Sequence, residues 1–152
     1  MLKKVTEIRH KIKPREDVDT LKLSFLLVTI YGKRFAALVD MGATHSFLCK
    51  KIATSFGKKV EVGRYLSAFK AMNSTMKAMT GVLKDTQVRV GSWFGKLDFR
   101  VINLDDHTMV MGQDFLKVAQ AIMMVDQDIL LITDEGKTMI VPTNRMSCLG
   151  YR

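Results

Sequence analysis

The chain has 152 residues, which is enough for one folded domain with a sizeable core. Its 47% hydrophobic and 26% charged content is typical of a globular protein and argues against a disordered chain. The 24 lysines and arginines outnumber the 15 acidic residues, for a formal net charge of +9. No apolar run approaches the roughly 20 residues of a membrane-spanning helix, so we expect no membrane partner.

The chain begins with a basic arm, which we assign to residues 1–18. Residues 1–15 carry six lysines and arginines against one glutamate, a net charge of +5. Such an arm can make weak contacts with the phosphate backbone of a nucleic acid, although a solvated tail is the simpler interpretation. Pro14 marks the approach to a folded domain, which we assign to residues 19–143. Residues 144–152 are assigned to a C-terminal tail.

The folded domain opens with strand patterns. Residues 21–30 predict a strand, residues 31–34 a turn and residues 35–39 an antiparallel partner strand. The second strand ends at Asp40, and Gly42 then allows the chain to turn sharply. A buried strand normally avoids a carboxylate, because an unpaired charge is costly to remove from water. Asp40 is therefore a candidate for chemistry.

A short helix is predicted after this turn. Apolar residues recur at helical spacing from residue 47 to residue 56. Thr44 or Ser46 is the predicted N-cap, and Gly57 is the predicted end.

A hairpin is predicted over residues 88–101. Apolar and polar residues alternate on both sides of a turn at residues 91–95, which indicates one face in contact with water. Trp93 and Phe94 in this turn could stack on nucleic-acid bases, but aromatic residues at a turn more often shield the edge of a core.

The last part of the chain predicts a helix and another hairpin. Residues 114–120, after Gly112, form the helix, and residues 129–133 and 138–141 form the hairpin. A β-rich chain with one or two short helices predicts an all-β fold, a closed barrel of six to eight strands.

Two motifs resemble a known family. Residues 37–47, ALVDMGATHSF, resemble the active-site loop of retropepsins, the small dimeric aspartic proteases of retroviruses and LTR retrotransposons. Residues 109–116, MVMGQDFL, resemble a later segment of that family, in which apolar residues and a glycine precede Asp-Phe-Leu or Asp-Trp-Leu. The continuation ATHSF is most similar to the gypsy-type retrotransposon branch. The resemblance covers roughly residues 21–142.

The resemblance implies an aspartic endopeptidase with a retropepsin-like acid protease fold, in which Asp40 is catalytic. Gly42 and Ala43 would shape its loop, and Thr44 would brace it. This chemistry needs one carboxylate to activate water and one carboxylic acid to protonate the carbonyl oxygen, so two aspartates share a proton. A single Asp40 per chain implies a homodimer. A second Asp-x-Gly match at residues 134–136 is interpreted as a hairpin turn.

The resemblance also implies a flap, a hairpin that closes over a polypeptide substrate in extended conformation. The flap would fall between residues 70 and 81, with its tip near residues that tolerate turn conformations. Met111 and Gly112 would support the active-site loop from beneath. The residues assigned to the flap and to substrate binding are Ala71, Met72, Asn73, Ser74 and Thr75.

Met41 departs from the family pattern, which has Thr or Ser between the aspartate and the glycine. In the family this hydroxyl hydrogen-bonds to the loop of the partner subunit. Methionine cannot donate, and a buried group left without its partner costs about 1–3 kcal/mol. The alternative function is therefore a catalytically inactive retropepsin-like domain that acts by binding or dimerisation. A basic β-barrel that binds single-stranded nucleic acid through the N-terminal arm is a third hypothesis.

No metal or cofactor is assigned. His45 and Cys49 stand four residues apart, but His107 and Cys148 lack the paired spacing that would complete a zinc site. Two cysteines indicate a reducing compartment. We expect an intracellular, cytoplasmic location within a virus-like particle or polyprotein, with the nucleus as the alternative, and a Gag-Pol-like polyprotein as substrate.

Overall fold

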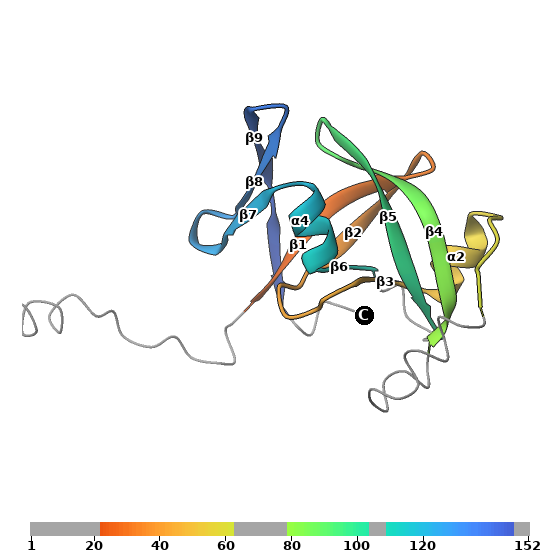
Figure 1. Ribbon diagram of the computed structural model, residues 1–152. Coiled ribbons are helices and arrows are strands. Elements are labelled where there is room, and N and C mark those ends of the chain that lie inside the picture. Colours follow the sequence, from red (N-terminus) through yellow and green to blue (C-terminus); the bar gives the residue numbers. More distant parts are fainter. Residues whose placement is uncertain (1–21, 63–78, 104–108, 148–152) are drawn as a thin grey trace, which may run out of the picture.

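The structure is a computed structural model that describes residues 22–62, 79–103 and 109–147 (Figure 1). Strands dominate this part of the chain, which confirms the predicted all-β class. The first elements are β1 (Lys22–Ile30), β2 (Lys33–Val39), β3 (Ser46–Cys49), α2 (Lys50–Ser55), β4 (Met79–Val90) and β5 (Trp93–Ile102). They are followed by β6 (Met109–Met111), α4 (Gln113–Val118), β7 (Ala121–Met124), η3 (Val125–Gln127), β8 (Ile129–Asp134), β9 (Lys137–Pro142) and β10 (Asn144–Ser147).

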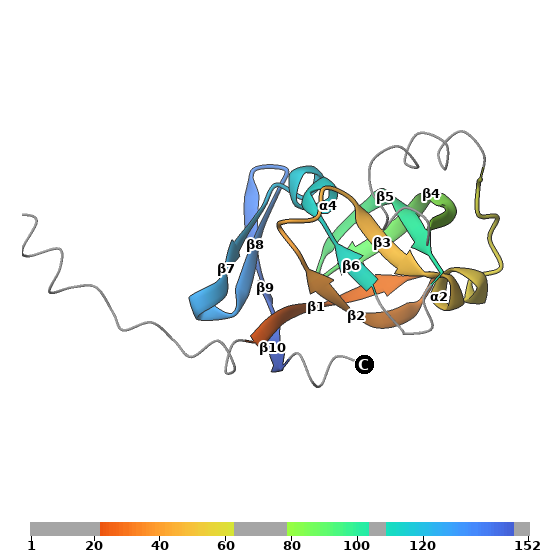
Figure 2. The same cartoon turned by 90° about the horizontal axis from the view of Figure 1, so that it is seen from below.

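The main sheet has the strand order β10-β1-β2-β6-β3-β5-β4. β1 also pairs with β4, through Thr29 with Arg89 and Ile30 with Val88, so the sheet returns on itself as the predicted barrel requires (Figures 1 and 2). Most of its pairings are antiparallel, but β2 runs parallel to β6 and β3 runs parallel to β5. These two parallel pairs lie on either side of the loop at residues 40–45, which the resemblance implies to be the active-site loop, because β2 enters the loop and β3 leaves it.

The core lies inside this sheet and follows the period-two alternation of the strands. In β1, Leu26, Val28 and Ile30 are completely buried, whereas Leu27 is 56% exposed. At the start of β5, Trp93 is 4% exposed and meets Phe115 of α4 edge to face, with ring centroids 5.5 Å apart. Trp93 thus shields the edge of the core, as predicted for an aromatic residue at a turn.

A separate three-stranded sheet of β7, β8 and β9 packs beside α4 (Figure 1). Leu130, Ile132 and Val141 on one face are buried in the common core. The predicted hairpin at residues 129–141 is confirmed, with its turn at Glu135 and Gly136, both of which have positive φ. The Asp-x-Gly match at this position is therefore a hairpin turn, as interpreted.

The predicted first helix starts too early, and an N-cap at Thr44 or Ser46 is wrong. Residues 46–49 form β3, which pairs with both β5 and β6, and the helix starts only at Lys50. Leu48 in the strand and Ile52 in the helix are both buried in the same core, so their four-residue spacing fits either structure. Gly57, with φ +64°, follows the helix end as predicted. No helix among the described residues is long and apolar enough to cross a membrane.

Candidate active site

Asp40 lies where the parallel pairing of β2 with β6 ends. Val39 pairs with Met111, and the next backbone N–H, that of Asp40, donates to the Met111 carbonyl oxygen at 3.0 Å. The backbone of Asp40 is thus fixed by the sheet, while its side chain is exposed. The strand therefore presents a solvent-accessible carboxylate at the end of a partly buried ladder.

The tip of the active-site loop turns tightly around this carboxylate. The N–H of Gly42 donates to Asp40 Oδ1 at 2.9 Å, and the N–H of Ala43 donates to the Asp40 carbonyl oxygen at 3.2 Å. A Cβ on residue 42 would lie 3.2 Å from Asp40 Oδ1, closer than most such contacts. Glycine therefore allows the backbone to orient the carboxylate at close range.

Met41 contributes its backbone to the loop and leaves its side chain outside. The side chain is 53% exposed. The backbone carbonyl oxygen of Met41 accepts a hydrogen bond of 2.7 Å from Nε2 of Gln113, the first residue of α4. Gln113 was not among the predicted site residues, because its amide reaches the loop only through the tertiary fold.

The base of the loop is held by a buried network between Ser46 and Asp114. The Ser46 hydroxyl donates to Asp114 Oδ1 at 2.7 Å, and the Ser46 N–H donates to Asp114 Oδ2 at 3.0 Å. The Ser46 hydroxyl in turn accepts from the N–H of Gly112 at 3.0 Å, and Asp114 Oδ1 accepts from the N–H of Phe115 at 2.8 Å. Ser46 is completely buried, whereas Asp114 is half-buried, so the network is shielded from water on the Ser46 side.

Sequence reasoning placed the brace on Thr44, whereas the described hydroxyl that ties the loop to α4 is that of Ser46. Thr44 itself is exposed. No local sequence signal marks Ser46, because its partner Asp114 lies 68 positions away in the chain.

Gly112 lies directly beneath the loop. A Cβ there would stand 2.5 Å from the carbonyl oxygen of His45 and 2.7 Å from that of Ala43. The next residue, Gln113, donates its N–H to the same Ala43 oxygen at 2.8 Å. The loop and the β6–α4 junction therefore approach so closely that only glycine fits, and Met111 and Gly112 lie where the resemblance implied support.

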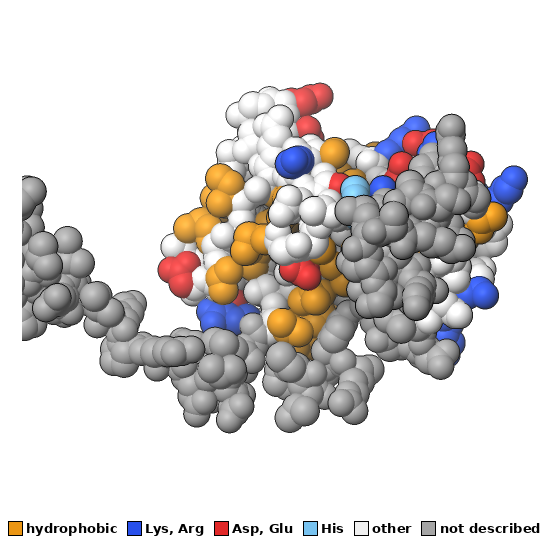
Figure 3. All heavy atoms as spheres, turned by 60° about the horizontal axis from the view of Figure 1, so that its bottom comes forward, with side chains coloured by type: hydrophobic (Ala, Val, Ile, Leu, Met, Phe, Trp, Pro, Cys, Tyr) orange, Lys and Arg blue, Asp and Glu red, His pale blue; other side chains and the backbone are white. Residues whose placement is uncertain are grey.

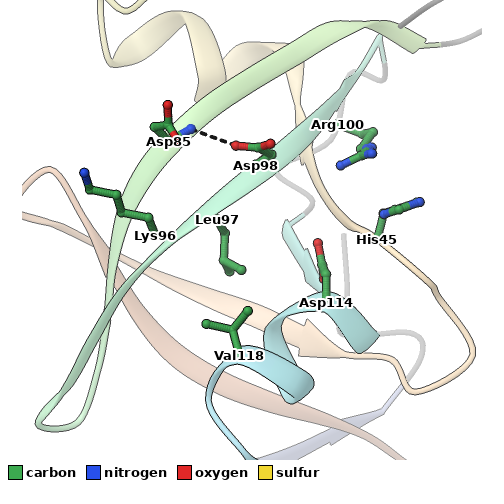
Figure 4. Close-up of a pocket in the computed structure, with 8 residues that line it drawn as sticks. All are labelled: His45, Asp85, Lys96, Leu97, Asp98, Arg100, Asp114 and Val118. Atoms are coloured by element: carbon green, nitrogen blue, oxygen red, sulfur yellow. Dashed lines mark hydrogen bonds between the residues drawn. The ribbon is translucent and has the colours of Figure 1, made fainter.

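A cavity of about 360 Å³ opens on another side of the loop base (Figure 4). Burial lowers the pKa of His45 below its usual 6.5, the Arg100 charge lowers it further, and the Asp114 charge opposes them. Asp40 does not line this cavity, so the candidate catalytic carboxylate opens elsewhere. The lining residues are His45, Asp85, Lys96, Leu97, Asp98, Arg100, Asp114 and Val118.

The other predicted site residues are distributed as follows. The flap residues Ala71 to Thr75 lie outside the described residues. Cys49 is completely buried, so its thiol is not accessible to a substrate. Within the described ranges, no three His, Cys, Asp or Glu side chains are grouped as metal ligands would be.

The chain is similar to one protein family and to solved structures. Residues 26–118 match the family described as "gag-polyprotein putative aspartyl protease". The fold is similar to the retroviral protease-like domain of Ddi1 from Leishmania major, with a TM-score of 0.67 and 24% identity over 82% of this chain and 96% of that chain. A retropepsin-like aspartic protease from Rickettsia conorii matches with a TM-score of 0.48 and 14% identity over 83% of this chain and 92% of that one. No curated protein matches. The likeness to the Leishmania domain shows a retropepsin-like fold.

Proposed function

Since the chain belongs to the family of gag-polyprotein aspartyl proteases, we propose that it is an aspartic endopeptidase that works as a homodimer. The observation that carries the proposal is the exposed Asp40 carboxylate, presented by a loop whose base is buried and hydrogen-bonded. One chain supplies one such carboxylate, and the reaction needs two.

In the proposed mechanism, two copies of Asp40 face each other across a two-fold axis. Like charges at such close range cannot both ionise, so the pair holds one proton. The ionised carboxylate takes a proton from water, which attacks the peptide carbonyl carbon, and the protonated carboxyl group donates its proton to the carbonyl oxygen. Collapse of the resulting intermediate breaks the C–N bond as the amine leaving group takes up a proton.

An exposed apolar face supports dimerisation. On the side of the small sheet that faces away from the core, Ile122, Leu131 and Ile140 are aligned across β7, β8 and β9. Ile122 is 64% exposed and Ile140 is 67% exposed. Figure 3 shows hydrophobic side chains gathered on this side of the molecule (left). Such a surface is costly to leave in water, and a second copy of the chain would cover it.

The proposed substrate is a Gag-Pol-like polyprotein of a gypsy-type LTR retrotransposon, cleaved at extended segments. The family name and the ATHSF continuation support this choice. We place the reaction inside the cell, within a virus-like particle or the polyprotein itself. Residues 1–18 would add weak contacts to nucleic acid there.

The test is cleavage of an unfolded protein at mildly acidic pH, compared between the wild type and Asp40→Asn. Asp134→Asn is the matched control, because it makes the same chemical change in the other Asp-x-Gly sequence. We expect Asp40→Asn to abolish cleavage, Asp134→Asn to retain it, and a statine-type inhibitor to block it. Cleavage that survives Asp40→Asn would reject the proposal.

Dimerisation is tested separately by sedimentation. Ile140→Lys places a charge on the apolar face, whereas Ala36→Lys places the same charge at an exposed position of β2. We expect only the first variant to shift the protein to monomer. A monomeric wild type that still cleaves would reject the two-fold site.

A second candidate function is supported by Met41, whose exposed side chain stands where the family has a hydroxyl. A catalytically inactive domain of this fold would act by binding or dimerisation. Met41→Thr restores a hydroxyl, and Met41→Ala removes the bulk of methionine without adding a donor. A gain in dimer affinity and turnover with Thr but not Ala favours the inactive-domain reading of the natural chain.

A further inference from the structure

Basic and aromatic side chains gather at the end of the molecule that carries α2 and the β1–β2 turn. Residues 31–39 contain Lys33 and Arg34, residues 50–60 contain four more lysines, and neither stretch contains an acidic residue. Figure 3 shows most of the visible Lys and Arg side chains on this side (right), with several Asp and Glu side chains among those at the upper right, opposite the apolar side chains of β7–β9. The mechanism proposed for Asp40 involves none of these residues.

The first half of this surface is an aromatic pair flanked by two lysines. Tyr31 and Phe56 meet edge to face with ring centroids 5.2 Å apart. Lys58 Nζ lies 5.2 Å from the centre of the Tyr31 ring, and Lys33 Nζ lies 5.9 Å from that of Phe56. Lys33 also donates to the Ser55 carbonyl oxygen at 3.4 Å. Lys58 is thus positioned beside a ring, Tyr31, that is 40% exposed, and Lys33 is positioned beside the adjoining Phe56 ring.

The second half is a row of residues across four strands. The strand register aligns Arg34 of β2, Thr29 of β1, Arg89 of β4 and Phe94 of β5. Val28 and Ile30 point into the core, so Thr29 and its row point outward. Phe94 is 56% exposed, and the Arg89 guanidinium lies 5.8 Å from its ring centre. A second exposed ring is therefore paired with a cation.

The two halves adjoin at the β1–β2 end of the sheet, where Lys33 pairs with the buried Ile30 and Arg34 pairs with Thr29, so the two side chains leave opposite faces of β2 beside each other. Together they offer cations for phosphates and exposed rings on which unpaired bases can stack. An acidic polypeptide without aromatic side chains, such as polyglutamate, would use the cations but would leave the rings without a stacking partner. Double-stranded nucleic acid keeps its bases stacked and out of reach. This combination selects a single strand.

We propose that this surface, formed by Tyr31, Lys33, Arg34, Lys58, Arg89 and Phe94, binds single-stranded nucleic acid. It is distinct from the N-terminal arm. Lys33 and Asp40 mark opposite ends of β2, whose seven residues span about 23 Å. A bound strand at the α2 end would therefore leave the Asp40 carboxylate accessible.

The test uses the full chain and a fluorescent single-stranded deoxythymidine oligomer of about 16 nucleotides, the upper range of common site sizes. Lys33→Glu/Lys58→Glu is compared with Lys117→Glu/Lys137→Glu, which makes the same charge change at exposed lysines of α4 and β9. At about 0.1 M salt, each lost phosphate contact lowers affinity about fivefold. We expect the first variant to bind the oligomer about 25-fold or more weakly than the wild type. The slope of log affinity against log salt concentration should also be less steep by about 1.4.

The aromatic contribution is tested with Tyr31→Asn and Phe94→Thr. Asparagine tolerates the positive φ of 49° at position 31, and threonine suits a strand. Each variant should bind the oligomer at least about fivefold more weakly, the lower limit for a stacked base. Melting curves of each variant show that the fold is retained.

Three outcomes would overturn the proposal. Equal losses in the two charge-reversed variants would mean that only net charge or the N-terminal arm acts. Unchanged binding in both aromatic variants would remove the stacking surface. Polyglutamate that competes as well as the oligomer would indicate a general anion surface. Asp40→Asn should bind the oligomer like the wild type, so failure of the protease proposal would not affect this result.

Discussion

The tip and the base of the active-site loop are only a few residues apart, yet they are stabilised in opposite ways. At the base, Ser46 is completely buried and its hydroxyl and N–H both reach Asp114. At the tip, Asp40 and Met41 are exposed, and the bonds that shape the turn run mostly to backbone atoms. The single chain thus completes the support of the loop by itself, whereas the tip presents its functional groups outward.

The largest loss of stability should follow when the close backbone contact at the base of the loop is blocked. Gly112→Ala would place a methyl group 2.5 Å from the His45 carbonyl oxygen, a distance that requires the backbone to move. We expect the free energy of unfolding to fall by more than about 4 kcal/mol, measured by urea denaturation. Gly42→Ala at the tip, where the nearest atom is 3.2 Å away, should cost far less. Similar losses in the two variants would remove the contrast between base and tip.

Removal of the buried hydroxyl is the next largest effect. Ser46→Ala leaves the Asp114 carboxylate without one donor and the Gly112 N–H without its acceptor. We expect a loss of about 1.5–3 kcal/mol in the free energy of unfolding, because one of these bonds involves a charged group. Thr44→Ala removes an exposed hydroxyl of the same loop and should stay within about 0.5 kcal/mol of the wild type. A larger loss of unfolding free energy in Thr44→Ala would indicate that Thr44 braces the loop.

The tip of the loop should keep its structure when the charge of Asp40 is removed. In Asp40→Asn the amide oxygen can still accept from the Gly42 N–H, so the loop keeps its internal bond. We expect the stability of the monomer to change by less than about 0.5 kcal/mol while cleavage disappears. Denaturation at a protein concentration below the dimer range measures the first quantity. A marked destabilisation would show that the carboxylate itself maintains the loop.

The smallest effect is the pH response of His45. Its pKa in the folded chain lies below 6.5, mainly because it is partly buried. The unfolded chain therefore binds the proton more readily, and stability should fall as the pH drops from about 6.5 through the lower pKa of the folded state. In His45→Gln the difference in unfolding free energy between pH 7.5 and pH 5 should be smaller than in the wild type. An equal difference in both proteins would exclude His45 as a contributor.

Sequence patterns predicted the hairpins well because period-two alternation and turn residues act locally. Asp40 was selected as a candidate because a carboxylate at the end of an apolar run conflicts with burial, and its catalytic role stays a prediction. The strand at residues 46–49 was missed because Leu48 and Ile52 satisfy helical spacing equally well, and only the pairing with β5 and β6 decides between them. The bond between Ser46 and Asp114 joins residues 68 positions apart, so no local pattern could assign their partnership.

β10 pairs antiparallel with the first part of β1, with Asn144 opposite Phe25. The first and the last strand of the described fold are therefore neighbours in the sheet. Polypeptide segments attached before β1 and after β10 would leave the fold at neighbouring positions. The fold would therefore not be distorted by a place between two other folded units. A domain of this construction can work as an insert, and neighbouring sequences can be exchanged without disturbing its core.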